Sequence, residues 1–173
     1  MTPVAAPTVP APASRPPRRQ RKTWRQKLAD DKGLPKVVKV AGAAAARWGG
    51  RTVAIPAPRE VDALMRRVPR GRVITINELR AAIARRHHAA VGCPITTGIF
   101  SWIAAHAAAE AAAAGATAIT PYWRTLKAKG ELNPKYPGGI PALAARLEAE
   151  GHRVVQKGRR FFVADCEKVI ARL

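Results

Sequence analysis

Hydrophobic positions repeat at helical spacing near the middle of the chain. Four of them stand at i, i+3, i+4 and i+7, which predicts one apolar stripe on a helix: Val61, Leu64, Met65 and Val68. This helix opens near Pro58, and Pro69 followed by Gly71 ends it. The next residues, RVIT, predict a brief extended piece.

Two further helices follow in close succession. Thr75 and Glu78 have the spacing of a capping box and predict the start of the second helix. Its predicted inward side chains are Ile76, Leu79 and Ile83, and its outward ones are Arg80, Arg85 and Arg86. The segment HHAAVGC predicts a turn, and Pro94 opens a third helix over 95–114. In a helix-turn-helix unit the second helix can enter a DNA groove.

The two ends of the chain have different patterns. Residues 1–22, rich in Ala, Pro and Arg, have little to bury and predict a disordered basic arm. Residues 23–54 predict a short helix, an extended run after Pro35 and the start of a loop, together an N-terminal extension packed on the domain. After Pro141 a helix runs to Gly151, a β-hairpin turns at Lys157-Gly158, and a short helix starts at Asp165. We therefore expect an α+β winged-helix (helix-turn-helix) domain over 55–173.

The charge of the chain indicates a polyanionic partner. Its 31 Lys and Arg against 11 Asp and Glu give a formal charge of +20, and residues 41–173 alone carry +12. The folded part is thus basic as well as the arm, which favours a binding face for nucleic acid on the domain.

Other classes of function are disfavoured by composition. No run approaches the ~18 apolar residues of a membrane span, and the first residues lack the pattern of a signal peptide, so we expect a cytoplasmic protein without membrane contact. The histidines and the two cysteines, Cys93 and Cys166, show no metal-ligand spacing. We expect no metal, no cofactor and reduced thiols.

Three motifs in order carry a resemblance to a known family. VPRGRVITINEL, then Pro121-Tyr-Trp-Arg-Thr125, then Tyr136-Pro-Gly-Gly139 followed by LEAEG resemble the DNA-binding domain of the O6-alkylguanine DNA alkyltransferases and their non-catalytic alkyltransferase-like relatives. The stretch from Thr23 to the C-terminus is similar to bacterial proteins grouped with that family. In the alkyltransferases the five residues read Pro-Cys-His-Arg-Val, where Cys accepts the alkyl group, His activates it through water and a Glu orients the His.

This sequence departs from the catalytic pattern. Tyr122 stands at the acceptor position and Trp123 at the activating position, while Glu150 matches the orienting glutamate. A phenol is protonated near neutrality and Trp offers only an N–H donor, so the transfer chemistry is missing. The tyrosine that helps to rotate the nucleotide falls on Ile76, and the intercalating arginine falls on or near Thr97.

The resemblance and the motif pattern select candidate residues. We expect DNA contacts from small, polar and basic side chains at the start of the second and third helices and in the following loops: Thr75, Asn77, Thr96, Thr97, Gly98, Ser101, Arg124, Lys127, Lys129 and Lys135. We expect a base pocket built from Tyr122, Trp123, Tyr136 and Glu150. Thr96 and Thr97 are also compatible with helix capping, Trp123 with a core position and Arg124 with a structural salt bridge.

Three hypotheses follow. The first is a non-enzymatic, alkyltransferase-like protein that binds double-stranded DNA, senses alkylated or flipped bases and works with other DNA-repair proteins at the bacterial nucleoid. The second is a nucleoid-associated or regulatory winged-helix protein with a vestigial pocket. The third is an enzyme in which Cys93 or Tyr122 accepts a group or cuts DNA, although a small buried residue at a helix start is the commoner role of such a cysteine.

Overall fold

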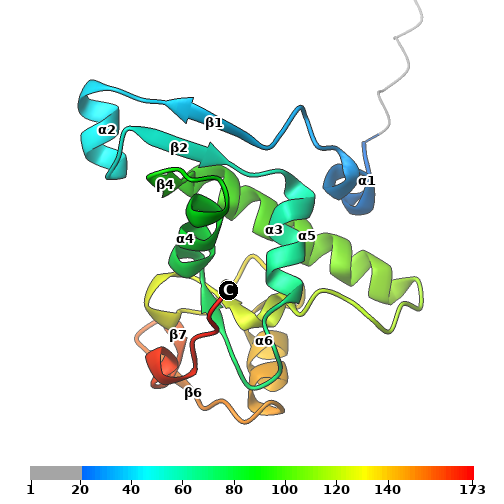
Figure 1. Ribbon diagram of the computed structural model, residues 1–173. Helices are drawn as coiled ribbons and strands as arrows, with labels where there is room; N and C mark the ends of the chain where they lie inside the picture. The colour runs from blue at the N-terminus through cyan, green and yellow to red at the C-terminus, as the bar shows by residue number, and fades with distance from the viewer. Residues whose placement is uncertain (1–20) are drawn as a thin grey trace, which may run out of the picture.

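A computed structural model describes residues 21–173, and the predicted arm therefore lies almost wholly outside the described residues. The chain folds into helices and three small sheets, so the predicted α+β class is confirmed (Figure 1). The α-helices are α1 (Trp24–Ala29), α2 (Gly42–Trp48), α3 (Pro58–Arg66), α4 (Ile76–Arg86), α5 (Pro94–Ala113) and α6 (Gly139–Glu148). The strands are β1 (Lys36–Lys39), β2 (Thr52–Ile55), β3 (Ile74–Thr75), β4 (Val91–Gly92), β5 (Thr125–Leu126), β6 (Val154–Lys157) and β7 (Arg160–Val163). Three short 3-10 turns complete the fold: η1 (Tyr122–Arg124), η2 (Ala128–Gly130) and η3 (Cys166–Val169).

The central helices form where the sequence pattern predicts them. The four residues of the α3 stripe are fully buried, and Pro58 occupies the first turn. Thr75 and Glu78 form the expected capping box at the start of α4, and Leu79 and Ile83 are buried in the core. Helix α5 begins at Pro94 and packs against α3 and α4. The helix-turn-helix order α4–α5 is therefore present, while the winged-helix topology stays a prediction.

The N-terminal segment contains more regular structure than predicted. The expected loop over 41–57 is wrong, because it holds helix α2 and strand β2. Strand β1 pairs antiparallel with β2, which pairs parallel with β4 at the entry to α5. Helix α1 packs on α5 and α3. The predicted domain boundaries stay predictions; position 54/55 lies inside β2.

The C-terminal segment encloses the remaining side of the core. Strands β3 and β5 pair in parallel, and β6 and β7 form the predicted hairpin, with Gly158 and Arg159 rather than Lys157 and Gly158 in the turn. Helix α6 starts two residues before Pro141. The last helix is the single 3-10 turn η3. The core lies between α3, α4, α5, α6 and these short strands.

Candidate nucleic-acid interface

The start of helix α5 is held by the sheet beside it. The Cys93 amide donates to the Ala54 carbonyl (2.8 Å), which continues the β2–β4 pairing into the first turn of the helix. Thr97 Oγ1 donates to the Cys93 carbonyl (2.7 Å), and Ser101 Oγ donates to the Gly98 carbonyl (3.0 Å). Thr97 and Ser101 are buried. These two hydroxyls stabilise the helix from inside, so their prediction as DNA contacts is wrong.

The exposed stripe of α5 is apolar. Ile95, Gly98, Ile99 and Trp102 stand at i, i+3, i+4 and i+7 and line one side of a hollow of about 560 Å³. Ile95 is 60% exposed and Ile99 47% exposed. A Cβ atom added to Gly98 would meet no protein atom within 4 Å. The fold therefore does not require this glycine, which costs helix stability and permits a partner to approach the backbone closely.

The other side of the hollow is a cationic loop fixed to α5. It is lined by Lys127, Asn133, Pro134 and Lys135. Trp102 Nε1 donates to the Lys135 carbonyl (3.1 Å), and His106 Nε2 lies 3.2 Å from the same oxygen. Helix α1 reinforces this anchor, because the Trp24 ring stacks on His106 with centroids 4.5 Å apart. The Lys135 side chain is left exposed at the edge of the hollow.

The predicted base pocket is filled by its own aromatic rings. Tyr122 and Tyr136 are each 4% exposed and belong to the hydrophobic core, with ring centroids 6.0 Å apart in a T-shaped contact. Burial raises the pKa of Tyr136 to about 12, against the smaller lowering effect of hydrogen bonds with Ser101 and Asn133. At this burial neither ring offers a free face against which a base could stack. Their prediction as pocket walls open to a base is therefore wrong.

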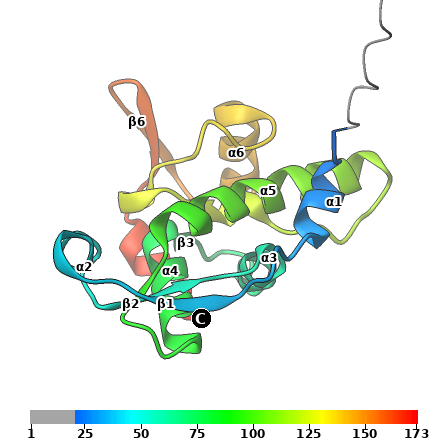
Figure 2. The ribbon, with the colours of Figure 1, turned by 90° about the horizontal axis from the view of Figure 1, so that it is seen from above.

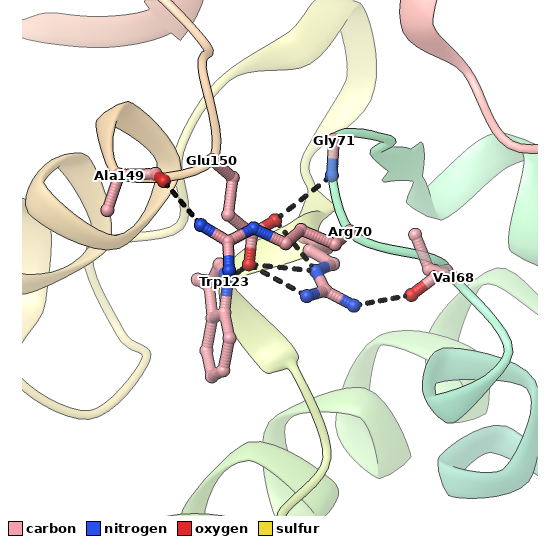
Figure 3. Close-up of polar contacts among 7 residues, drawn as sticks. Val68, Arg70, Gly71, Trp123, Ala149 and Glu150 are labelled. Carbon is pink, nitrogen blue, oxygen red and sulfur yellow. Dashed lines mark hydrogen bonds and ion pairs between the residues drawn. The ribbon is translucent and has the colours of Figure 1, made fainter.

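Glu150 is the acceptor of a dense hydrogen-bond network (Figure 3). Its carboxylate accepts from Trp123 Nε1 (2.8 Å) and from Arg124 Nε and Nη2 (both 2.8 Å at closest), and Arg124 Nη1 donates to the Val68 carbonyl (2.7 Å). The Glu150 and Arg124 side chains are only 8% and 14% exposed. Burial tends to raise the pKa of Glu150, but the hydrogen bonds from Arg124 and Trp123 outweigh it and leave that pKa lowered. Glu150 thus orients Trp123 and Arg124 and ties η1 to α6.

The remaining predicted residues fall into two groups. Thr75 is buried as the α4 cap, the Thr96 hydroxyl is buried without a hydrogen-bond partner among residues 21–173, and Arg124 is committed to Glu150 and Val68. Asn77, Lys127, Lys129 and Lys135 are exposed and stay candidates for DNA contact, as does the half-buried Gly98. Lys127 Nζ forms an ion pair with Glu131 (2.5 Å).

Two exposed residues of α5, Ile95 and Ile99, were not predicted as surface residues from the sequence. Ile95 and Ile99 form an apolar stripe, but α5 is apolar on nearly every face, so spacing alone does not tell an exposed stripe from a buried one. Cys93, the alternative nucleophile, is 5% exposed at the helix start.

The described surface carries a large excess of unpaired positive charge. Three of the 31 Lys and Arg lie in residues 1–20 and no acid does, so residues 21–173 have 28 cations, 11 acids and a net charge of +17. Their ion pairs engage seven of these Lys and Arg: Lys22, Arg66, Arg86, Arg124, Lys127, Arg160 and Lys168. Most cations are therefore free to meet an external anion.

The described residues contain neither a cluster of metal ligands nor a helix that could span a membrane. Among residues 21–173, no three His, Cys, Asp or Glu side chains are grouped as metal ligands. No helix in the same range has the length and apolar character needed to cross a membrane.

Comparison with known proteins gives two distant structural likenesses. No protein-family model matches the sequence, and no curated protein is similar to it in sequence. The crystal structure of S. pombe Atl1 in complex with damaged DNA containing O6-carboxymethylguanine is 17% identical, with a TM-score of 0.48. That of S. pombe ATL in complex with DNA is 19% identical, with a TM-score of 0.49. Each alignment covers 67% of this chain and 94% of the other, and at these scores neither likeness assigns a family or function to the chain.

Proposed function

We propose that this protein is a non-enzymatic duplex DNA-binding protein that uses helix α5 and the loop 127–135 as its contact surface. The observation that carries the proposal is the exposed Ile95–Ile99 stripe beside the cationic 127–135 loop, on described residues of net charge +17. Exposed isoleucines on a helix are unfavourable in water unless a partner covers them. The surrounding lysines select a polyanion as that partner, and duplex DNA combines phosphates with apolar sugar and base surfaces.

The shape of the α5 stripe suits a minor-groove contact. Proteins that bind in the minor groove insert apolar side chains between base steps, and the larger contact surface on the bent DNA offsets the free-energy cost of unstacking. Ile99 is positioned as such a wedge, and the bare backbone at Gly98 allows the helix to come close to the sugar edges. Lys127 and Lys135 line the hollow, and the exposed Lys129 stands in the same loop, so these lysines are available to neutralise phosphates.

Alkyl transfer is not part of the proposed function. The acceptor position holds the buried Tyr122, and the adjacent Trp123 ring donates its N–H to Glu150 instead of serving as a base. Cys93 is buried beneath the first turn of α5. Neither group combines an accessible nucleophile with a base that could activate it. A DNA partner would place the protein at the nucleoid.

A second candidate function is supported by the hollow beside α5. Its volume of about 560 Å³ lies within the range of small-molecule sites, and Trp102 and Ile99 supply apolar walls while Asn133 supplies polar groups. A displaced or alkylated base could stack in this hollow instead of in the filled Tyr122–Tyr136 cluster. Damage sensing, and with it cooperation with repair proteins, is proposed on this basis.

The experiment for duplex binding is a titration of a fluorescent duplex at rising salt. We expect affinity to fall steeply with salt, because each neutralised phosphate contributes about −0.9 to the slope of log K against log salt. Changing Lys127, Lys129 and Lys135 together to Gln should reduce the slope. The pair Ile95→Ala and Ile99→Ala should weaken binding without changing the slope, since apolar contacts release no counterions. Absence of salt-dependent binding by the wild-type protein would overturn the proposal.

Damage sensing is tested with intact, mismatched and O6-methylguanine duplexes. If the hollow receives the base, Trp102→Ala should abolish a preference for the modified duplexes and keep affinity for the intact one. Trp123→Ala is the matched control, because its ring lies in the Glu150 network and outside the hollow. Equal wild-type affinity for all three duplexes would remove this second function and leave duplex binding intact.

A further inference from the structure

The segment from β1 to β2 projects from the body of the protein as a cationic flap, residues 36–55. Its sequence contains Lys36, Lys39, Arg47 and Arg51, and no acid occurs anywhere between positions 32 and 59. All four side chains are exposed, and none forms an ion pair with another part of the described chain. Holding four like charges on a small unit without counter-charges is unfavourable, and a polyanion relieves this repulsion.

The tip of the flap contributes little to the core. Helix α2 buries none of its residues, and the buried residues of β2, Val53 and Ala54, lie at the base of the flap. In both views α2 lies at the outer end of the β1–β2 arm, away from α6 and the C-terminal hairpin (Figures 1 and 2). Lys39 and Arg51 line a shared hollow with Gly42 and Thr52 at the root of α2. The arrangement therefore presents charge at a surface that the fold itself leaves uncovered.

The base of the flap is fastened to the entrance of helix α5. Strand β2 pairs with β4, and the Cys93 amide donates to the Ala54 carbonyl. The Ala90 amide donates to Thr52 Oγ1 (2.9 Å), and a Cβ atom at Gly50 would lie only 2.3 Å from the Ala90 Cβ. This close approach fixes the flap against the turn that precedes α5. The flap is thus a positioned neighbour of the proposed DNA-contacting helix.

We propose that the flap is a second phosphate-binding element, in which Lys39, Arg47 and Arg51 contact the DNA backbone on the N-terminal side of helix α5. This inference rests on the proposed duplex binding and extends the contact beyond the α5 surface. Residues 43–46 of α2 are all alanine, so this part of the helix has no bulky side chain to hold the DNA backbone away from Arg47, while Trp48, the last residue of α2, is half-buried. The flap increases affinity for any sequence, because phosphate contacts carry no base information.

The test compares two matched pairs of exposed arginines in the full-length protein. Arg47→Gln with Arg51→Gln removes flap charge, while Arg67→Gln with Arg172→Gln removes equal charge elsewhere; both pairs are free of ion pairs within residues 21–173. The flap pair should lower the salt slope by about 1.8 and weaken binding on the order of tenfold, if each arginine neutralises one phosphate. The charge-retaining pair Arg47→Lys with Arg51→Lys should keep most of the affinity.

Backbone protection supplies a second readout. The length of duplex that the protein protects from hydroxyl radicals should decrease on one side of the site for the Arg47→Gln, Arg51→Gln variant. It should stay unchanged for the Arg67→Gln, Arg172→Gln control. Equal effects of the two pairs on slope and protection would overturn the flap proposal while the wild-type protein still binds DNA. A wild-type protein without salt-dependent binding would instead overturn the proposed function. If Arg47→Gln with Arg51→Gln weakened binding to vesicles of phosphatidylserine and phosphatidylcholine but not binding to the duplex, the assignment of the flap to DNA would also be overturned.

Discussion

Replacement of Glu150 by Ala tests whether the network at η1 is a structural lock. The change removes the acceptor for Trp123 Nε1 and for the Nε and Nη2 donors of Arg124. The Arg124 side chain is 14% exposed in the wild-type protein, and the variant leaves it the Val68 carbonyl as a hydrogen-bond acceptor. Removing one member of a buried ion pair costs about 3–5 kcal/mol, because the other charge is left uncompensated.

A loss of this size is a large part of the stability of a typical domain, about 5–15 kcal/mol. For a chain of this length, 1 kcal/mol shifts Tm by about 2–4 °C, so Glu150→Ala should lower Tm by roughly 6–20 °C. The matched control is Glu131→Ala, whose partners Lys127 and Arg160 are 46% and 70% exposed. Glu131 is itself 13% exposed, but both of its cations reach solvent and pairs of this kind contribute about 0–1 kcal/mol, so the control should move Tm by at most a few degrees.

The assay is urea unfolding followed by far-UV circular dichroism, together with a thermal scan of each variant. Circular dichroism is preferred to Trp fluorescence because the Glu150 change alters the surroundings of Trp123 directly. If Glu150→Ala lowered the free energy of unfolding by less than about 1 kcal/mol, or by no more than Glu131→Ala does, the structural role of the Glu150 network would be refuted. The stability loss of Glu150→Gln should lie between the losses of Glu150→Ala and Glu131→Ala, since Gln keeps an acceptor oxygen and loses the charge.

Three other predictions follow from single sites. Gly98→Ala should raise the free energy of unfolding by about 0.5–1 kcal/mol in urea unfolding, because the added methyl group lies in open space on a helix. The same variant should weaken duplex binding in the titration. Unchanged DNA affinity would contradict a close approach of the duplex to the backbone at Gly98. The pKa of Glu150 is lowered from 4.5, and burial lowers the pKa of His152 from 6.5, so the free energy of unfolding should be highest above these ordinary values and should decrease as the pH falls below each of them. Unfolding measured from pH 8 to 3 should show one decrease below pH 6.5, from His152, and another below pH 4.5, from Glu150. Glu150→Gln should remove only the decrease below pH 4.5. Tyr122→Cys with Trp123→His should not restore methyl transfer from O6-methylguanine DNA, because position 122 is buried in the core; a mass gain of one methyl group would contradict this.

Much of the local structure was predictable from sequence. The spacing of Val61, Leu64 and Met65, the Thr75–Glu78 capping box and Pro94 place three helices correctly, because these signals act within a few residues of the chain. The β6–β7 hairpin is equally local, with alternating residues on both sides of a two-residue turn. The charge excess, and hence the class of partner proposed, also needs no coordinates.

The tertiary structure decided which side chains are available. Tyr122 and Tyr136 are apart in sequence, and only the folding of η1 against α5 and α6 shows that they fill the core instead of forming a pocket. Helix α5 has apolar residues on nearly every face, so its period does not say which stripe is covered. Packing of α1 and α3 buries the Ala104–Ala108 side, and the 95–99 stripe is left exposed. Burial depends on neighbours distant in sequence, whereas helix formation depends on neighbours within one turn.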